Sequence, residues 1–355
     1  MKLLSVTIAD GVVPRTDIEG KDNSSEDKSN YKIVRIGDMV YNTMRMWQGA
    51  SGVSAFDGIV SPAYTILKDA AQLDRGFMAT LFKTESLINE FRKNSQGLTS
   101  DTWNLKYPQI ATIKVHLPNI QEQHQVATFL SIIGSRIAAQ RRLVELLKKH
   151  KRGVQSAIFE GQLRIPCQGR ECWAEWETVK IGDIFDERSE RGGNADELLS
   201  VTINFGVKRQ SDTEKKDSSS EDKGNYKRVA EGDIVYNTMR MWQGASGVSP
   251  WAGIVSPAYT VIYPKARQNT TFWAFAFKHW RLVQTFQKFS QGLTSDTWNL
   301  KFPQLADIKV AVPSLEEQNA IVDFLSRLDA RTDAAQSELA RLAALKSGFL
   351  QVLFA

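Results

Sequence analysis

Cysteine, histidine and long apolar runs are all scarce in this sequence of 355 residues. The chain has only two cysteines, Cys167 and Cys172, and four histidines. A zinc site needs about four ligands, and no histidine or further cysteine lies near the cysteine pair, so we expect two reduced, structural thiols. A run of about eighteen apolar residues is also absent, which excludes a membrane-spanning helix.

Motifs of self-contained enzymes are missing as well. No glycine-rich loop follows a strand pattern and opens a helix, which excludes a P-loop and a dinucleotide fingerprint. The Asn/Asp-Pro-Pro-Tyr/Phe tetrapeptide of amino-methylating DNA methyltransferases is absent, as is a nuclease-like acidic pair beside a lysine. The start, MKLLSVTIADGVV, becomes polar too early for a signal peptide. We therefore expect a cytoplasmic chain without a catalytic centre or a bound metal.

What the sequence does contain is a domain-sized repeat with a constant offset of 195 residues. Three blocks recur almost unchanged: VYNTMRMWQGASGVS at Val40 and Val235, GIVSPAYT at Gly58 and Gly253, and SQGLTSDTWNLK at Ser95 and Ser290. Residues 1–160 match 196–355 without an insertion, and 161–195 have no counterpart. Because solenoid units span only about 20–50 residues, the chain is interpreted as two copies of one module.

Each module has a mixed pattern of short strands and helices. YKIVRIGDMVYNTM and YKRVAEGDIVYNTM predict strand, turn and strand, and GIVSPAYTIL predicts another short strand. ATIKVHLP and ADIKVAVP predict strands that end at a proline. Helical spacing appears in 74–93 and 269–289, and a strand around Thr178–Phe185 is expected to open the second module. These patterns predict an α/β or mixed α+β fold.

A long heptad pattern follows each of these proline-ended segments. Apolar residues recur at alternating steps of four and three, which is typical of helix-on-helix packing. In the first copy they are Val126, Leu130, Ile133, Ile137, Val144, Leu147, Val154 and Ile158, with Gln140 and Lys151 at the two polar places. In the second copy the same places hold Ile321, Leu325, Leu328, Thr332, Ala335, Leu339, Leu342, Lys346, Phe349 and Leu353.

Neither apolar seam is stable in water, so each helix needs a partner. We expect the two helices to pair with each other in antiparallel orientation; the alternative is that each helix folds back on its own module. Antiparallel pairing would give the chain a pseudo-two-fold axis and place the two modules at a fixed separation, in inverted sense. A DNA duplex has the same kind of two-fold symmetry.

The duplicated blocks carry side chains suited to DNA. Arg, Asn and Gln make bidentate contacts to base edges, and Lys neutralises phosphates. The candidates in the first module are Asn42, Arg45, Trp47, Gln48, Lys93, Gln96, Thr99, Asn104 and Lys106. Those in the second are Asn237, Arg240, Trp242, Gln243, Lys288, Gln291, Thr294, Asn299 and Lys301. The alternative is that Tyr41, Met44, Trp47 and Pro62 are core or turn residues and that identity reflects recent duplication.

Three further basic features fit a polyanionic partner, although many basic proteins bind no nucleic acid. The formal net charge is +5. Polar loops at 15–32 and 208–227 carry Lys21, Lys28, Lys215, Lys216 and Lys223. The helical stretch 141–152, RRLVELLKKHKR, is strongly basic, whereas its counterpart is not. A solvated surface is the alternative for each.

With these features, the sequence resembles the DNA-specificity (S) subunits of type I restriction–modification systems. The resemblance rests on the repeated module with its IGDIV-type strands and SPAY block, and on the passage SQGLTSDTWNLKYPQIATIKVHLPNIQEQHQVATFL. The end of this passage recurs in the second copy as KFPQLADIKVAVPSLEEQNAIVDFL. It implies two target recognition domains, at 1–120 and 176–315, long spacer helices at 121–160 and 316–355, and a linker at 161–175.

The resemblance also implies function and partners. Each module would recognise one half of a split site in double-stranded DNA, and the paired helices would set the spacing. Two methylase (M) subunits, carrying S-adenosylmethionine, would dock on the helices and methylate adenine; restriction (R) subunits would use ATP and magnesium. The chain itself would bind no cofactor. The Gln-rich helix starts, 121–125 and 316–318, would belong to the docking region.

Two points depart from, or extend, the family pattern. Family members usually open with a segment like WETVKIGDIFDERSERGG, which occurs here only at 176–193. Either the start is truncated, or the gene is a rearranged product, or another chain supplies the missing strand to the first module. The close similarity of the modules suggests an interrupted palindrome as the DNA site. A stand-alone DNA-binding repressor or architectural protein is the alternative function, and a self-contained enzyme or a scaffold that binds no DNA are further rivals.

Overall fold

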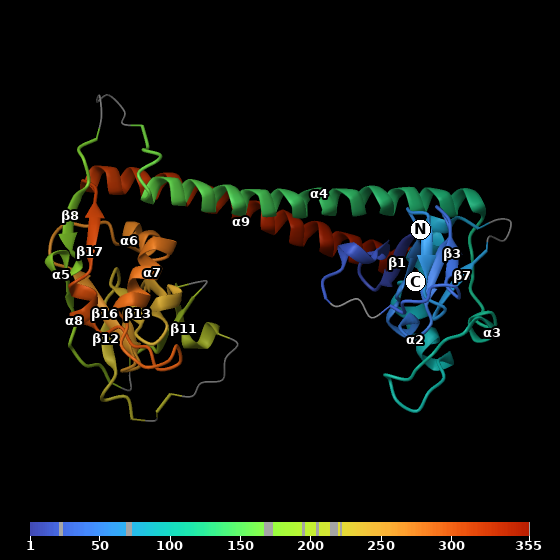
Figure 1. Cartoon of the computed structure of the whole chain (residues 1–355), viewed down its shortest axis with the longest axis horizontal. Coiled ribbons are helices and arrows are strands. Elements are labelled where there is room, and N and C mark those ends of the chain that lie inside the picture. The colour runs from blue at the N-terminus through green and yellow to red at the C-terminus, as the bar shows by residue number, and fades with distance from the viewer. Residues whose placement is uncertain are drawn as a thin grey trace. The chain divides into compact units, whose positions relative to one another are not determined.

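The computed structural model describes residues 1–20, 24–68, 73–166, 173–193, 196–203, 206–213, 219–220 and 222–354. Both cysteines, Lys21, Lys215 and Lys216 lie outside the described residues. The chain forms two compact units, Met1–Leu143 with Ala335–Ala355, and Val144–Ala334 (Figure 1). Within the described part, no helix is long and apolar enough to cross a membrane, and no group of three or more metal-ligating side chains is found.

The first unit contains two small sheets. Its strands are β1 (Lys2–Thr7), β2 (Gly11–Pro14), β3 (Lys32–Val34), β4 (Met39–Asn42), β5 (Ser51–Val53), β6 (Gly58–Val60) and β7 (Tyr64–Leu67). The sheet orders are β2-β1-β6-β3 and β5-β4-β7. The predicted strand–turn–strand around Gly37 is present as β3 and β4. GIVSPAYTIL forms two strands instead of one, because Ser61–Ala63 make a turn between β6 and β7.

The second unit repeats this plan and adds strands. They are β8 (Glu177–Lys180), β9 (Phe185–Glu187), β10 (Leu199–Thr202), β11 (Gly206–Arg209), β12 (Lys227–Val229), β13 (Ile234–Asn237), β14 (Ser246–Val248), β15 (Gly253–Val255), β16 (Tyr259–Pro264) and β17 (Lys309–Val312). The four-stranded sheet of this unit has the order β14-β13-β16-β9, and β17 pairs with β8. The mixed α+β class predicted from the sequence is therefore confirmed.

Two sequence predictions in these segments were wrong. The segment expected as one strand at Thr178–Phe185 is β8, a helical turn α5 (Ile181–Ile184) and β9. ATIKVHLP forms no strand, although its counterpart ADIKVAVP contains β17. The physical reason is pairing: β17 is held by β8, and the first module has no counterpart of β8 among its residues.

Short helices cover the sheets. They are α1 (Arg75–Leu81), α2 (Glu85–Asn94) and α3 (Tyr107–Ile110) in the first unit, and α6 (Thr270–Ala276), α7 (Trp280–Phe289) and α8 (Phe302–Ala306) in the second. The single helix predicted at 74–93 is two helices, because the Thr84 hydroxyl accepts a hydrogen bond from the Leu87 amide and starts a new N-terminus.

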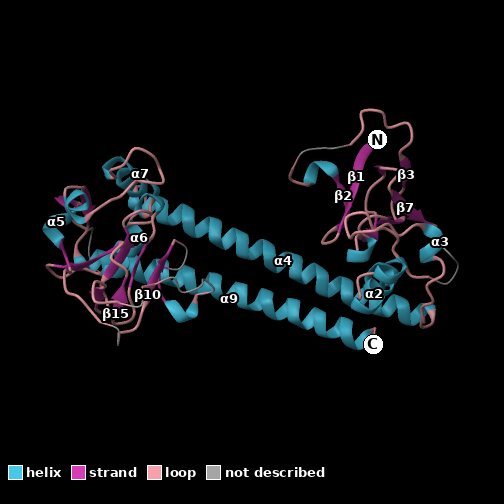
Figure 2. Cartoon of the chain, turned by 90° about the horizontal axis from the view of Figure 1, so that it is seen from below, coloured by secondary structure: helices cyan, strands magenta, loops and turns pink. Residues whose placement is uncertain are grey.

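The two long helices are α4 (Ile120–Phe159) and α9 (Leu315–Leu353). Every predicted seam position except Leu353 is buried or half-buried. In the first unit Phe129 packs edge-on against Phe349, with ring centroids 4.8 Å apart, and Arg136 lies 3.8 Å from Glu338. The start of α4 thus faces the end of α9, and the antiparallel pairing is confirmed (Figure 2).

The polar positions of the seam are paired rather than left unsatisfied. The Gln140 amide donates to the Ala335 carbonyl over 2.9 Å. In the second unit, Lys151 forms an ion pair with Asp329. A polar group inside a helix interface fixes the register, because any shift would leave that group without its partner.

A buried glutamine ties each long helix to its module. Gln318 accepts a hydrogen bond from the Asn269 amide and donates to the Pro313 carbonyl and the Gln268 side chain. Gln123 makes the equivalent bonds to the Asp74 amide and the Pro118 carbonyl. Both side chains are buried, so they depart from the expectation that 121–125 and 316–318 belong to the docking region, which otherwise stays a prediction.

Glu317 departs from that expectation for a different reason. It is buried and accepts hydrogen bonds from Arg164 and Trp176. Because Arg164 and Trp176 lie in the unmatched stretch, the equivalent Glu122 has no such partners in the first copy and is exposed. At these helix starts, Gln121, Glu122, Gln125 and Glu316 remain on the surface.

We predict that Gln318→Leu lowers the free energy of unfolding by about 1–3 kcal/mol, because it leaves a buried amide and carbonyl unpaired. Urea unfolding followed by circular dichroism measures the change. The matched control, Gln336→Leu at an exposed position of α9, is expected to stay within about 0.5 kcal/mol of the parent. Equal losses in the two variants would contradict the role given to Gln318.

Candidate nucleic-acid interface

The three duplicated blocks meet at one place in each module. In the first, the Leu105 amide donates to the Thr43 carbonyl over 2.8 Å, and the Thr43 hydroxyl donates to the Ala63 carbonyl over 2.7 Å. In the second, Leu300, Thr238 and Ala258 make the same bonds. Segments up to 62 residues apart are thus joined by hydrogen bonds of the backbone and of a threonine hydroxyl, which explains why the blocks recur together.

A pair of tryptophans joins the first block to the third. Trp47 packs edge-on against Trp103 with ring centroids 5.1 Å apart, and Trp242 packs against Trp298 at 5.2 Å. The Trp47 indole N–H donates to the Met44 carbonyl. Such pairs contribute about 0.5–1.5 kcal/mol beyond their burial, so they hold the third block against its neighbour.

Part of the first block is structural, as the alternative interpretation held. Tyr41 and Tyr236 are fully buried, and burial raises the pKa of both hydroxyls, so they stay neutral core groups. The Asn42 side-chain oxygen accepts a hydrogen bond from the Met44 amide and closes a turn. Met44, in contrast, is exposed.

The third block forms a tight loop after α2 and again after α7. The backbones of Gln96 and Asn104 pair with each other at its base. The Thr99 amide donates to the Thr102 hydroxyl, and the Thr102 amide donates to the Thr99 carbonyl. Gly97 has φ +146°, and a Cβ there would lie 2.7 Å from the Thr102 backbone. The loop shape is therefore fixed by local contacts, and the second copy repeats it with Gly292 at φ +141°.

Leucine stands fully exposed at the tip of this loop in both copies, at Leu98 and Leu293. The sequence analysis did not single out either residue, because a leucine within a duplicated block is more often a core residue. The signal that could have found them is their setting: each follows a glycine and precedes a threonine in a polar loop. A rigid loop that presents a large apolar side chain is suited to contact another molecule.

The predicted site residues separate into two groups by exposure. Eleven are on the surface: Arg45, Lys93, Gln96, Thr99, Lys106, Arg240, Gln243, Lys288, Gln291, Thr294 and Lys301. Seven are half-buried: Asn42, Trp47, Gln48, Asn104, Asn237, Trp242 and Asn299. We call the exposed members of each copy, together with Leu98 or Leu293, the loop face of that module.

Each loop face carries positive charge at its base. Lys106 and Lys301 are the N-cap residues of α3 and α8, directly after the loop. Lys93 and Lys288 lie in the last turns of α2 and α7 before it. Lys93 lies 2.7 Å from Glu90, but its side chain is 70% exposed, and such surface pairs are weak. The lysines are therefore available to a polyanion that contacts the loop.

Comparison with known proteins identifies the kind of module that carries this face. A family model described as the type I restriction modification DNA specificity domain matches residues 174–344. The chain is 24% identical over 342 residues to the type I restriction enzyme MjaVIII specificity subunit of Methanocaldococcus jannaschii, which covers 87% of this chain and 77% of that protein. The second module and most of α9 thus match the DNA specificity domain, and the chain as a whole is similar to specificity subunits of type I restriction enzymes.

Further matches agree with this family. The putative type I restriction enzyme MjaX specificity subunit of the same organism is 22% identical over 194 residues, which span 50% of this chain and 44% of that protein. The HsdS subunit from Thermoanaerobacter tengcongensis has a TM-score of 0.51 at 16% identity, covering 93% of this chain and 83% of that one. The S subunit from M. genitalium has a TM-score of 0.54 at 15% identity, covering 91% and 84%.

The structural matches show that this chain shares its fold with solved S subunits. The matches to DNA specificity domains and subunits support a role in DNA sequence recognition. The stand-alone repressor or architectural protein, kept as the alternative from sequence, has no support among these relatives.

Proposed function

We propose that this chain recognises a bipartite DNA site, one half by each module, and directs adenine methylation and restriction by partner subunits. The observation that carries the proposal is the duplication of one exposed, basic and polar surface, the loop face, with the same local contacts in both copies. Two equal surfaces on one chain fit a ligand that repeats, as the two halves of a DNA site do.

Within each loop face the residues have different roles. Arg45 and Arg240, with Gln96 and Gln291, contact base edges, because Arg and Gln form bidentate hydrogen bonds there. The four lysines contact phosphates, which fixes position without selecting sequence. Thr99 and Thr294, with Gln243, supply further polar contacts. The half-buried residues hold these side chains in place: Asn42, Trp47, Gln48, Asn104, Asn237, Trp242 and Asn299.

Leu98 and Leu293 add an apolar contact at the loop tip. Proteins that bind the minor groove often place apolar side chains against or between base steps. The rigid loop holds each leucine exposed before DNA arrives, so little ordering is needed on binding. Such contact contributes affinity that does not depend on salt.

The long helices supply spacing and a surface for partners. A helix of 40 residues extends about 60 Å, and the satisfied polar groups of the seam fix its register against α9. Phe129, Ile132 and Leu143 are exposed apolar residues on α4, and methylase subunits dock there. Two methylase subunits would carry S-adenosylmethionine, and restriction subunits would use ATP and magnesium, while this non-catalytic chain works in the cytoplasm without a cofactor of its own.

We predict that loss of phosphate contacts changes the salt dependence of DNA binding, whereas loss of apolar contacts does not. The double variant Lys106→Ala with Lys301→Ala should reduce the slope of log affinity against log salt by about 1.8, because each lost phosphate contact removes about 0.9. Leu98→Ala with Leu293→Ala should weaken binding at an unchanged slope. The control Arg327→Ala, on exposed α9, should change neither. A slope that drops equally in all three would contradict these roles.

We also predict that the DNA site is an interrupted palindrome, because the two loop faces are nearly identical. Expression of the chain with its partner methylase, followed by genome-wide mapping of methylated adenine, measures the site. The expected result is one half-site repeated in inverted order at a fixed separation. Two unrelated half-sites would refute the palindrome, and an unbroken short motif would refute the bipartite site itself.

A further inference from the structure

The two modules differ in how well their equivalent core residues are covered. In the second module Ile262, Leu305, Ile308 and Val310 are buried. At the equivalent places of the first module, offset by 195, Leu67, Ile110 and Ile113 are only half-buried and Val115 is exposed. The residue types are alike, so the difference lies in what packs on them.

In the second module the covering segment is residues 177–187. β9 pairs with the edge of β16, with Tyr263 opposite Asp186, and β8 pairs with β17. Between them Ile181, Ile184 and Phe185 are buried in the core. This segment therefore closes one edge of the sheet and supplies three large apolar side chains.

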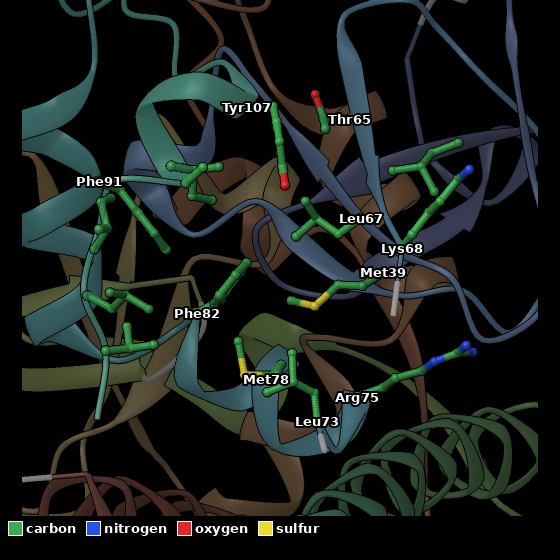
Figure 3. Close-up of a pocket in the computed structure, with 16 residues that line it drawn as sticks. Met39, Thr65, Leu67, Lys68, Leu73, Arg75, Met78, Phe82, Phe91 and Tyr107 are labelled. Atoms are coloured by element: carbon green, nitrogen blue, oxygen red, sulfur yellow. The ribbon is translucent and has the colours of Figure 1, made fainter. Parts of the chain in front are cut away.

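The first module has a cavity of about 560 Å³ at this place. Met39, Leu67, Met78, Phe82 and Tyr107 point toward its centre, whereas the charged ends of Lys68 and Arg75 point toward one side (Figure 3). Among the described residues, β7 pairs only with β4. Its other edge offers backbone groups that the equivalent strand, β16, uses to bind β9.

The first module also has the charged residues that bind the covering segment in the second module. In the second module, Glu187 pairs with Lys227 over 3.0 Å, and the Arg188 guanidinium binds Asp233 at 2.6 Å. The equivalents in the first module are Lys32 and Asp38. The Lys32 ammonium contacts the Pro62 and Tyr64 carbonyls, and the Asp38 carboxylate accepts only backbone amides among its described hydrogen bonds.

We propose that this groove of the first module binds a peptide with the pattern of residues 177–188, in the strand–turn–strand conformation that these residues adopt in the second module. The segment adds a strand to the edge of β7 and inserts apolar side chains at the places of Ile181, Ile184 and Phe185. At its C-terminal end, the acidic residue at the place of Glu187 pairs with Lys32, and the basic residue at the place of Arg188 pairs with Asp38. The chain's own segment is already held by β16 and β17, so it cannot fill both grooves. Strand addition with side-chain pockets is a common mode of peptide recognition.

The test uses the full chain and a fluorescent peptide of residues 176–188, WETVKIGDIFDER. Binding is followed by fluorescence anisotropy, and amide hydrogen exchange locates the site. We expect saturable binding of one peptide per chain, with slowed exchange at 64–67 and 114–117. A peptide with Asp at the places of Ile184 and Phe185 should bind at least about tenfold more weakly, because it loses the burial of two large apolar side chains.

A matched pair of protein variants separates the groove from other surfaces. Asp38→Ala removes the partner of the peptide's arginine and should weaken binding several-fold. Asp57→Ala, a carboxylate next to β6 that bonds the Ile36 amide, should leave binding unchanged. Equal effects of the two variants would overturn the proposed docking mode.

Three further outcomes would overturn the proposal. One is the absence of saturable binding, or binding without protection at 64–67. Another is self-association of the chain that protects the same amides without peptide, since a second copy would then be the occupant. The third is protection only when residues 176–195 are fused directly before Met1, which restores the spacing of the second module; the segment would then act within one chain.

Discussion

Burial of the apolar seam along α4 and α9 is the constraint on which the rest of the structure depends. Neither helix can stay in water alone, and in each unit a part of one packs against an antiparallel part of the other. Gln140 and Lys151 fix the register of that packing, since a shift would leave their polar groups without partners. Gln123 and Gln318 then connect each helix to the loop that precedes α1 or α6. Module position is therefore coupled to helix packing through buried hydrogen bonds.

The duplicated blocks contain both residues that fix the local structure and residues that are exposed on the surface. Thr43 and Trp47 join blocks that are distant in sequence, and Gly97 allows the loop to turn back sharply. With those positions fixed, Arg45 and Leu98 are presented to solvent in a defined setting. A change in one scaffold residue would move several surface side chains at once, which is a physical reason for the blocks to recur as units.

Much of this fold follows from local patterns. The heptad seam and the strands around Gly37 are predicted because their periodicity is local and their packing needs no further information. The division of 74–93 into α1 and α2 depends on a cap at Thr84, which a spacing pattern does not contain. Residues 114–117 form no strand, and among the described residues no strand pairs with them, whereas their counterpart β17 pairs with β8. The exposed Leu98 was missed because apolar character alone predicts a core position; only its setting between Gly97 and Thr99 in a polar loop points to the surface.

The claim that each module recognises its own half-site is tested most directly by selecting bound duplexes from a random DNA library with single-module variants. For Arg45→Ala, the account predicts a selected motif in which one half-site keeps its base preference and the other becomes degenerate, by about 1–3 kcal/mol at the contacted base. Arg240→Ala should give the same asymmetry, because the loop faces are equivalent. If either variant relaxes both half-sites equally, or leaves both unchanged, the account is contradicted.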